Sequence, residues 1–192
     1  GVLPCDEGTV SKKSNLEIGY LQQNEALDDD NTLEEEIKSA LERTYTVRRL
    51  MAEISAKMAS ADVGSDEYKR LESEYAALDN EYTALDGYTA DTRINRVLTG
   101  LGFRDFDLKM KTSALSGGEK MRFGMAKILL RNPELLILDE PTNHLDFSML
   151  AWLEDYIKSY KGAVLTVSHD RYFLDNIVSG IYEIEQKHIY KY

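Results

Sequence analysis

The chain has 192 residues, enough to bury a sizeable core in one or two domains. A formal net charge of −11 argues against binding to bare nucleic acid through a general basic face, although a local patch could still meet a structured ribonucleoprotein. Cys5 is the only cysteine, which excludes an intramolecular disulfide and fits a reducing cytosol. No apolar run approaches the roughly 20 residues of a membrane helix, and no signal peptide opens the chain. We therefore expect a cytoplasmic protein without membrane insertion.

Residues 1–32 are predicted to be the remnant of an N-terminal lobe, because the chain opens without a Met. A short strand-like run is formed by Leu16, Ile18, Tyr20 and Leu21. It ends at Gln22 and Gln23, and the polar residues 28–32 that follow are suited to capping a helix.

Residues 33–98 are predicted to form an antiparallel helical hairpin. Apolar residues recur at helical spacing in two runs, first at Val47, Met51, Ile54 and Met58, then at Tyr68, Leu71, Tyr75, Leu78, Tyr82 and Leu85. The polar break at 60–65, which contains Gly64, separates the two runs. Such seams are first of all packing devices, and acidic residues outnumber basic ones here, so charge does not mark the hairpin as a nucleic-acid arm.

Residues 99–192 have the alternation of an α/β core. A helix beginning near Gly118 should place one apolar face inward, made of Met121, Met125, Ile128 and Leu129. The apolar runs 135–138 and 163–167 are typical of buried parallel strands, with a crossover helix over 152–160 between them. Residues 181–184 and 188–190 are predicted to be a final pair of strands.

The first of four candidate functional motifs is Leu115-Ser116-Gly117-Gly118-Glu119, at the start of that helix. A helix start exposes unpaired N–H groups and the positive end of the dipole, which favours phosphate. Two glycines allow an anion to approach the backbone, and Ser116 adds a hydroxyl. The alternative for this motif alone is a serine N-cap followed by a glycine turn.

The second motif is the acid pair Asp139 and Glu140, directly after the strand 135–138. Open α/β sheets bind ligands at this carboxyl edge. One carboxylate could hold Mg²⁺ through water, and the other could orient or deprotonate an attacking water. Because strand residues alternate between faces, we expect the two acids to have different roles. Taken alone, the pair could instead cap the next helix.

The third and fourth motifs lie at the same expected edge. Residues 142–146, Thr-Asn-His-Leu-Asp, follow the acids directly, and their simplest alternative is a polar loop with an N-cap at Asp146. His169 follows the strand 163–167 and could hydrogen-bond a terminal phosphate, although a lone histidine there is more often structural. The order and spacing of the four motifs together favour a nucleotide site.

These motifs resemble those of ATP-binding cassette proteins. Residues 115–119 resemble the signature motif, 135–140 the Walker B strand, His169 the switch histidine and 19–23 the Q-loop. Residues 140–146, Glu-Pro-Thr-Asn-His-Leu-Asp, and 168–175 are similar to the forms typical of the ABC-F family, the soluble members with two cassettes in one chain. The fold implied is a P-loop NTPase core, and a hairpin after the Q-loop is where that family carries its arm.

The resemblance implies ATP hydrolysis with Mg²⁺ and a role for each motif. Glu140 would be the general base, His169 the γ-phosphate sensor, and Asp139 with Gln23 the magnesium contacts. Contacts to the nucleotide of a second cassette would come from Ser116, Gly117, Gly118, Glu119 and Asp146. The closing of two cassettes would drive the arm, 33–98, against the ribosome near bound tRNA.

The sequence departs from the family pattern in one respect. No Gly-x-x-x-x-Gly-Lys-[Ser/Thr] motif occurs in it, so the phosphate cradle is missing and the core is expected to be incomplete. We therefore expect these 192 residues alone to bind ATP weakly and to show no measurable ATPase. In related folds the phosphate-loop strand lies between the strand before His169 and the strand near Ile181. Its absence would leave two free sheet edges, through which copies of the chain could associate.

Three alternative readings remain open. A nucleotide-binding subunit of an ABC transporter shares the chemistry but needs no hairpin of this length. A chromosome- or repair-type cassette would carry a far longer coiled coil than one that turns near Gly64. The 192 residues could also serve purely as an interaction module.

Overall fold

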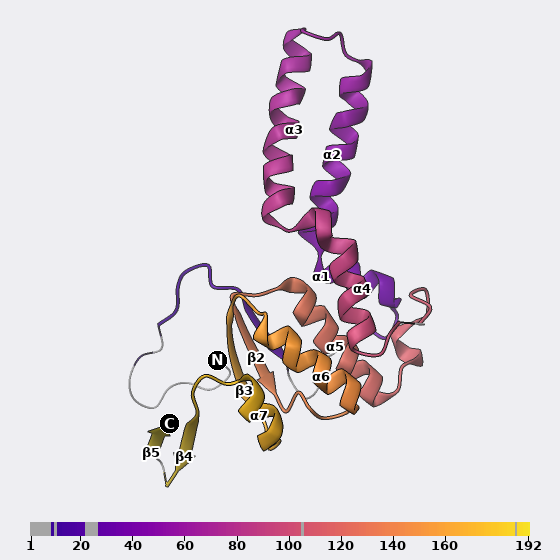
Figure 1. Ribbon diagram of the computed structural model, residues 1–192. Helices are drawn as coiled ribbons and strands as arrows, with labels where there is room; N and C mark the ends of the chain where they lie inside the picture. The colour runs from indigo at the N-terminus through magenta and orange to yellow at the C-terminus, as the bar shows by residue number, and fades with distance from the viewer. Residues whose placement is uncertain (1–8, 10, 22–26, 105, 187) are drawn as a thin grey trace.

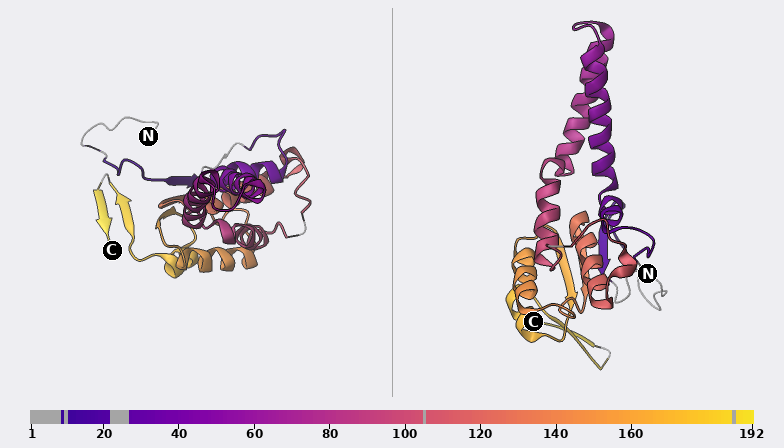
Figure 2. Two further views of the ribbon diagram at one scale, coloured as in Figure 1. Left: turned by 90° about the horizontal axis from the view of Figure 1, so that it is seen from above. Right: turned by 90° about the vertical axis from the view of Figure 1, so that its right-hand side faces the viewer.

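A computed structural model describes residues 9, 11–21, 27–104, 106–186 and 188–192. Its α/β core carries a long helical hairpin that projects from one end (Figures 1 and 2). The α/β class expected from the sequence is therefore confirmed.

Three parallel strands form the central sheet in the order β1-β2-β3: β1 is Ile18–Leu21, β2 Leu135–Asp139 and β3 Ala163–Val167. Apart from these, β4 (Tyr182–Glu185) and β5 (His188–Lys191) form an antiparallel pair. In the described part of the chain β3 pairs only with β2, and β4 only with β5. Both free edges anticipated from the sequence are thus present among these strands.

Helix α5 (Gly117–Arg131) is the central helix of the core. The expectation of a single apolar face was too narrow, because every residue from Phe123 to Leu130 is buried. It packs against β1, α1 and α4, so that its sides all meet other elements. Two further helices follow the strands: α6 (Phe147–Lys158) links β2 to β3, and α7 (Arg171–Ile177) follows β3.

Only one face of the sheet is covered by the described residues. Leu21, Leu136 and Leu138 point into the core and are fully buried. On the other face Leu165 and Val167 are 54% and 58% exposed. The prediction that 163–167 is a buried strand was therefore wrong, because a strand is buried on both faces only when elements cover each side of the sheet.

The hairpin consists of α2 (Glu42–Ser60) and α3 (Asp66–Ala84), which pack together over their length (Figure 1). Helix α1 (Leu33–Ala40) leads into α2, and α4 (Ala90–Gly100) follows α3; both pack on α5. Two short 3₁₀ turns, Gly87–Thr89 and Thr112–Ala114, complete the helical segments.

The predicted apolar seam holds the hairpin together. Val47, Met51 and Tyr82 form a buried cluster, with Tyr75, Leu78 and Leu85 packed around it. The chain turns where the sequence pattern breaks: α2 ends at Ser60, Gly64 has a left-handed φ of 90°, and Ser65 caps α3.

None of the helices in the described part of the chain combines the length and apolar character that a membrane crossing requires.

Replacing Val47 with alanine tests the seam. Val47 is fully buried, and removing two methyl groups should lower the free energy of unfolding by about 2 kcal/mol. Urea denaturation and amide exchange in α2 would measure the loss. Val63→Ala is the matched control, because Val63 is 86% exposed at the turn and its truncation should change stability by less than about 0.5 kcal/mol. Equal effects of the two substitutions would contradict this packing.

Candidate nucleotide site

The structure brings Glu140 and His169 together at the carboxyl ends of β2 and β3. The Glu140 N–H donates to the carbonyl of Val167 at 2.8 Å, which extends the strand pairing by one bond. The His169 N–H donates to Glu140 Oε2 at 3.3 Å, and His169 Nε2 lies 3.5 Å from Glu140 Oε1. The imidazole is almost fully exposed, whereas the Glu140 side chain is mostly covered. A shielded carboxylate thus faces an accessible imidazole.

The side chains of Asp139 and Glu140 are placed differently, but the cause is not the alternation of faces along a strand. Asp139 is the last residue of β2, opposite Val167, whereas Glu140 has left the strand with a φ of 48°. His144 also has a left-handed φ, 66°. This conformation costs a non-glycine residue about 1–2 kcal/mol, and such strain clusters at functional sites. The turn re-aims Glu140 toward β3, while Asp139 remains on the uncovered face of the sheet.

Residues 116–119, named the signature turn because they resemble the signature motif, form the start of α5 and cap it themselves. Ser116 Oγ accepts from the Glu119 N–H, and Glu119 Oε2 accepts from both the N–H and the hydroxyl of Ser116. These bonds from Ser116 lower the pKa of Glu119. The simple reading as a serine N-cap therefore holds locally. It is compatible with anion binding, because a Cβ at Gly117 would meet no atom within 4 Å, so the helix start is open.

The loop 142–146 lies against the signature turn. A Cβ at Gly118 would come within 3.4 Å of His144 Nδ1, so the two segments are in close contact. Asp146 caps α6: its Oδ1 accepts from the Met149 N–H at 2.9 Å and from the Ser148 hydroxyl at 2.7 Å. Among the candidate residues, Gln23 lies outside the described residues.

Sequence reasoning missed Arg122. Its Nη1 donates to the carbonyl of His144 at 3.2 Å, and its guanidinium lies over the ring of Phe103, 5.7 Å from the centroid. It also contributes to lowering the pKa of Glu119 and of Asp146. The available signal was its position three residues after Glu119, on the same side of the helix. A long arginine side chain there can reach the loop that contains His144.

A comparison with known families identifies the chain. The family model described as "ABC transporter" matches residues 1–143. The chain belongs to the ABC transporter family. The chain is similar to the ATP-binding protein YdiF of Bacillus subtilis (strain 168), to which it is 41% identical over 197 residues that cover 100% of this chain and 30% of YdiF.

A second relative is the energy-dependent translational throttle protein EttA of Escherichia coli (strain K12), 34% identical over 94% of this chain and 32% of EttA. The chain therefore spans about a third of the length of these curated relatives.

Solved structures agree on the ABC transporter family fold. An ATP-binding subunit of an ABC transporter superposes with a TM-score of 0.56 at 18% identity, covering 85% of this chain and 53% of that one. The archaeal ribosome recycling factor aABCE1, in complex with the ribosomal stalk protein aP1, superposes with a TM-score of 0.57 at 21% identity, covering 97% of this chain and 28% of that one.

Domains of the ABC transporter family use ATP with Mg²⁺, and the residues present fit both. In the described ranges no group of three or more His, Cys, Asp or Glu side chains could hold a metal ion by itself. Mg²⁺ is commonly held by one or two carboxylates, with waters and substrate phosphates completing the shell. Asp139, at the carboxyl edge beside Glu140, suits that mode, and the open turn at Gly117 suits a phosphate.

The N-cap that Asp146 provides for α6 depends on pH. The pKa of its carboxyl lies below the usual value, first because the Met149 N–H donates to it and second because the Ser148 hydroxyl does. The stabilisation is complete above the unfolded pKa, about 4, and is lost as pH falls through the lower folded pKa. Asn at position 146 can still cap the helix but does not titrate. At pH 7 the Asp146→Asn variant should therefore have a lower free energy of unfolding than the wild type, and this deficit should shrink below about pH 4.

Urea unfolding at pH 7, 4 and 3 would measure that deficit. Asp62→Asn is the control, because Asp62 is exposed in the turn between α2 and α3 and caps neither helix. A deficit for Asp146→Asn that is the same at each pH would refute the charged cap.

Proposed function

We propose that the chain is an ATP-binding cassette of a two-cassette ATPase of the ABC-F kind, which acts on the ribosome during translation. The observation that carries the proposal is the meeting of Glu140 with His169 at the ends of adjacent parallel strands. The packing of His144 against Gly118 adds support, because it joins the loop after the acids to the signature turn.

Glu140 is the general base in this proposal. Its shielded carboxylate lies at the carboxyl edge of the sheet, where it could take a proton from an attacking water. The exposed His169 imidazole, held near Glu140, contacts the γ-phosphate. Asp139 and Gln23 would hold Mg²⁺, largely through water. When bound, the metal neutralises charge on the phosphates, and the protein groups position the nucleotide and the water.

The signature turn serves the nucleotide of a second cassette. Gly117 and Gly118 offer N–H groups at the positive end of α5, and Ser116 offers a hydroxyl that must exchange Glu119 Oε2 for the phosphate as its acceptor. Glu119 fixes that hydroxyl, and Asp146 at the start of α6 faces the same partner. The first residues, 1–32, and the last, 99–192, would then belong to one cassette, and 33–98 would be its arm.

Translation is favoured as the process by two named proteins. EttA is called an energy-dependent translational throttle protein, and aABCE1 is called a ribosome recycling factor. The hairpin of α2 and α3 projects away from the core (Figure 2), as an arm toward the ribosome or bound tRNA would. A cytoplasmic location follows from this proposal.

The alternative is a nucleotide-binding subunit of an ABC transporter. It is favoured by the name of another relative, the ABC transporter ATP-binding protein YfmM of Bacillus subtilis (strain 168), 35% identical over 100% of this chain and 37% of YfmM. The projecting hairpin argues against it, since a transporter subunit needs no such arm. Co-purification with ribosomes rather than with membranes would separate the two.

Glu140→Gln tests the assignment of the general base. In the whole protein it should lower magnesium-dependent ATP hydrolysis by about 100-fold or more, while ATP binding persists, because general-base catalysis contributes about 10²–10⁴. Steady-state phosphate release and equilibrium nucleotide binding would measure the two effects. Glu134→Gln is the matched control, because Glu134 lies before β2 and pairs with Lys13 on the surface. Unchanged hydrolysis by Glu140→Gln would refute the role.

The 192 residues by themselves give a further expectation. Without a phosphate-loop motif in this sequence, they should bind ATP weakly and show no measurable hydrolysis. Robust turnover by these residues that is lost with Glu140→Gln would contradict the expectation.

We also propose that copies of this chain associate through β3, whose outer edge has no strand partner in the described part. Leu165 is 54% exposed beside that edge, so Leu165→Lys should shift light-scattering mass toward the monomer. Val63→Lys, at the exposed hairpin turn, should leave the mass distribution unchanged. A chain that is monomeric at all concentrations would end this proposal.

A further inference from the structure

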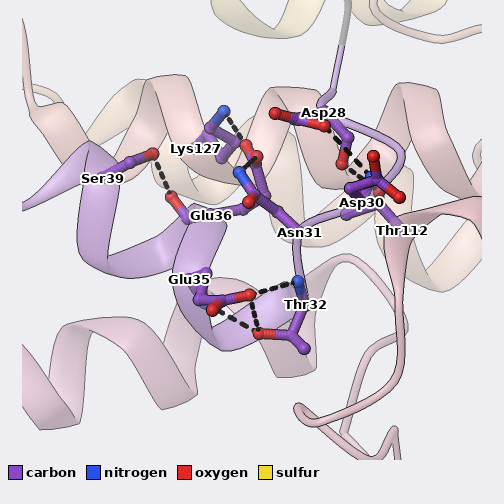
Figure 3. Close-up of polar contacts among 9 residues, drawn as sticks. All are labelled: Asp28, Asp30, Asn31, Thr32, Glu35, Glu36, Ser39, Thr112 and Lys127. Atoms are coloured by element: carbon purple, nitrogen blue, oxygen red, sulfur yellow. Dashed lines mark hydrogen bonds and ion pairs between the residues drawn. The ribbon is translucent and has the colours of Figure 1, made fainter.

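Glu36 and Lys127 are the only charged residues that are buried in the described part of the chain, and they pair with each other. The Lys127 ammonium on α5 donates to Glu36 Oε2 on α1, and Asn31 Nδ2 donates to Glu36 Oε1 at 2.7 Å (Figure 3). Burial alone would raise the pKa of Glu36, but the bonds from Lys127 and Asn31 more than offset it and hold the pKa below its usual value. Each carboxylate oxygen of Glu36 therefore has a hydrogen-bond donor.

The segment that leads into the hairpin is fastened along α5 at a second point. Lys120 Nζ lies 2.5 Å from Asp29 Oδ1, and Lys120 and Lys127 are seven residues apart on one side of α5. The buried Thr112 donates through its hydroxyl to the carbonyl of Asp28 at 2.5 Å and through its N–H to Asn31 at 2.9 Å (Figure 3). Residues 28–36 thus make directed polar contacts along α5, which is called the signature helix after its first turn.

The two helices that join the hairpin to the core, α1 and α4, both pack on α5. Helix α1 continues into α2 across the single buried residue Leu41, where the Tyr45 N–H still donates to the Leu41 carbonyl. Helix α4, which follows α3, packs on α5 as well. The signature residues Ser116 to Glu119 form the first turn of α5, so that hairpin and signature turn share one support.

The kind of contact between α1 and α5 decides whether a movement of the hairpin also moves the signature turn. Apolar surfaces have no directional preference and can slide by a fraction of a helical turn. A buried ion pair cannot separate without leaving an uncompensated charge, which is strongly unfavourable. Replacing both partners with apolar residues often preserves stability, so the stabilising and the positioning contributions of such a pair can be separated by experiment.

We propose that Glu36 and Lys127 are positioning residues that make the base of the hairpin and the signature helix move as one body. A partner that displaces the hairpin then displaces Ser116 to Glu119 by the same contact, and a nucleotide bound at the signature turn restricts the hairpin in return. The consequence for ATP rests on the proposed function, whereas the mechanical coupling does not.

Spin-label distances in the nucleotide-free chain test the coupling. With Cys5→Ser as background, labels at Ser55→Cys on α2 and Ser113→Cys before α5 should give one narrow distance distribution. The pair Glu36→Met with Lys127→Met should at least double the width of that distribution while the melting temperature stays near that of the wild type. Labels at Ser55→Cys and Ser73→Cys, both within the hairpin, should give the same width in every variant.

Lys127→Arg, which retains the charge, should keep the narrow distribution. An unchanged width in a stable Glu36→Met, Lys127→Met variant would overturn the proposal, because packing alone would then fix the helix. If that variant does not fold, Glu36→Gln decides: it retains an acceptor but removes the charge, and a width equal to that of the wild type would equally overturn the proposal. If Glu140→Gln does not lower hydrolysis, the proposed function is refuted. The widths expected for the spin-label distances stay the same, because they do not depend on nucleotide.

Discussion

The parallel pairing of β2 with β3 is the constraint on which the candidate site depends. It sets Asp139 opposite Val167, and the next N–H, that of Glu140, reaches the Val167 carbonyl. The two strands then end at the same level, so that the residues after them meet although nearly thirty positions separate them. A shift of one residue in this register would reverse the face of every side chain on β3 and separate Glu140 from His169.

Helix α5 links the two halves of the molecule in a comparable way. Its interior is buried over eight consecutive residues, which leaves only its ends free for other tasks. Its first turn carries the open Gly117, and its middle carries Lys127, which pairs with Glu36 at the base of the hairpin. Arg122, between them, ties the loop after the acids to the same helix. Anything that moves α5 therefore reaches the hairpin and the signature turn together.

Exposed charged residues and buried or hydrogen-bonded ones have different roles in this chain. Most of the acidic excess lies on exposed positions, where ion pairs such as Arg49 with Glu53 contribute little. The buried pair of Glu36 and Lys127 and the hydrogen-bonded carboxylates of Glu119 and Asp146 instead fix helix ends and helix positions. Composition and net charge do not distinguish these groups, because the difference lies in burial and hydrogen bonding.

The sequence by itself determined most of the elements, because local patterns specify them, and it predicted the kind of site. Periodicity predicted the two helices of the hairpin and the break near Gly64, and four ordered motifs predicted a nucleotide site at the carboxyl edge of a sheet. Only the tertiary structure decided what depends on distant partners. It showed that β3 has an exposed face, that Glu140 turns out of its strand through a left-handed conformation, and that Lys127 pairs with Glu36. The physical reason is that burial, backbone strain and ion pairing depend on which surfaces meet, and residues far apart in the chain set these contacts.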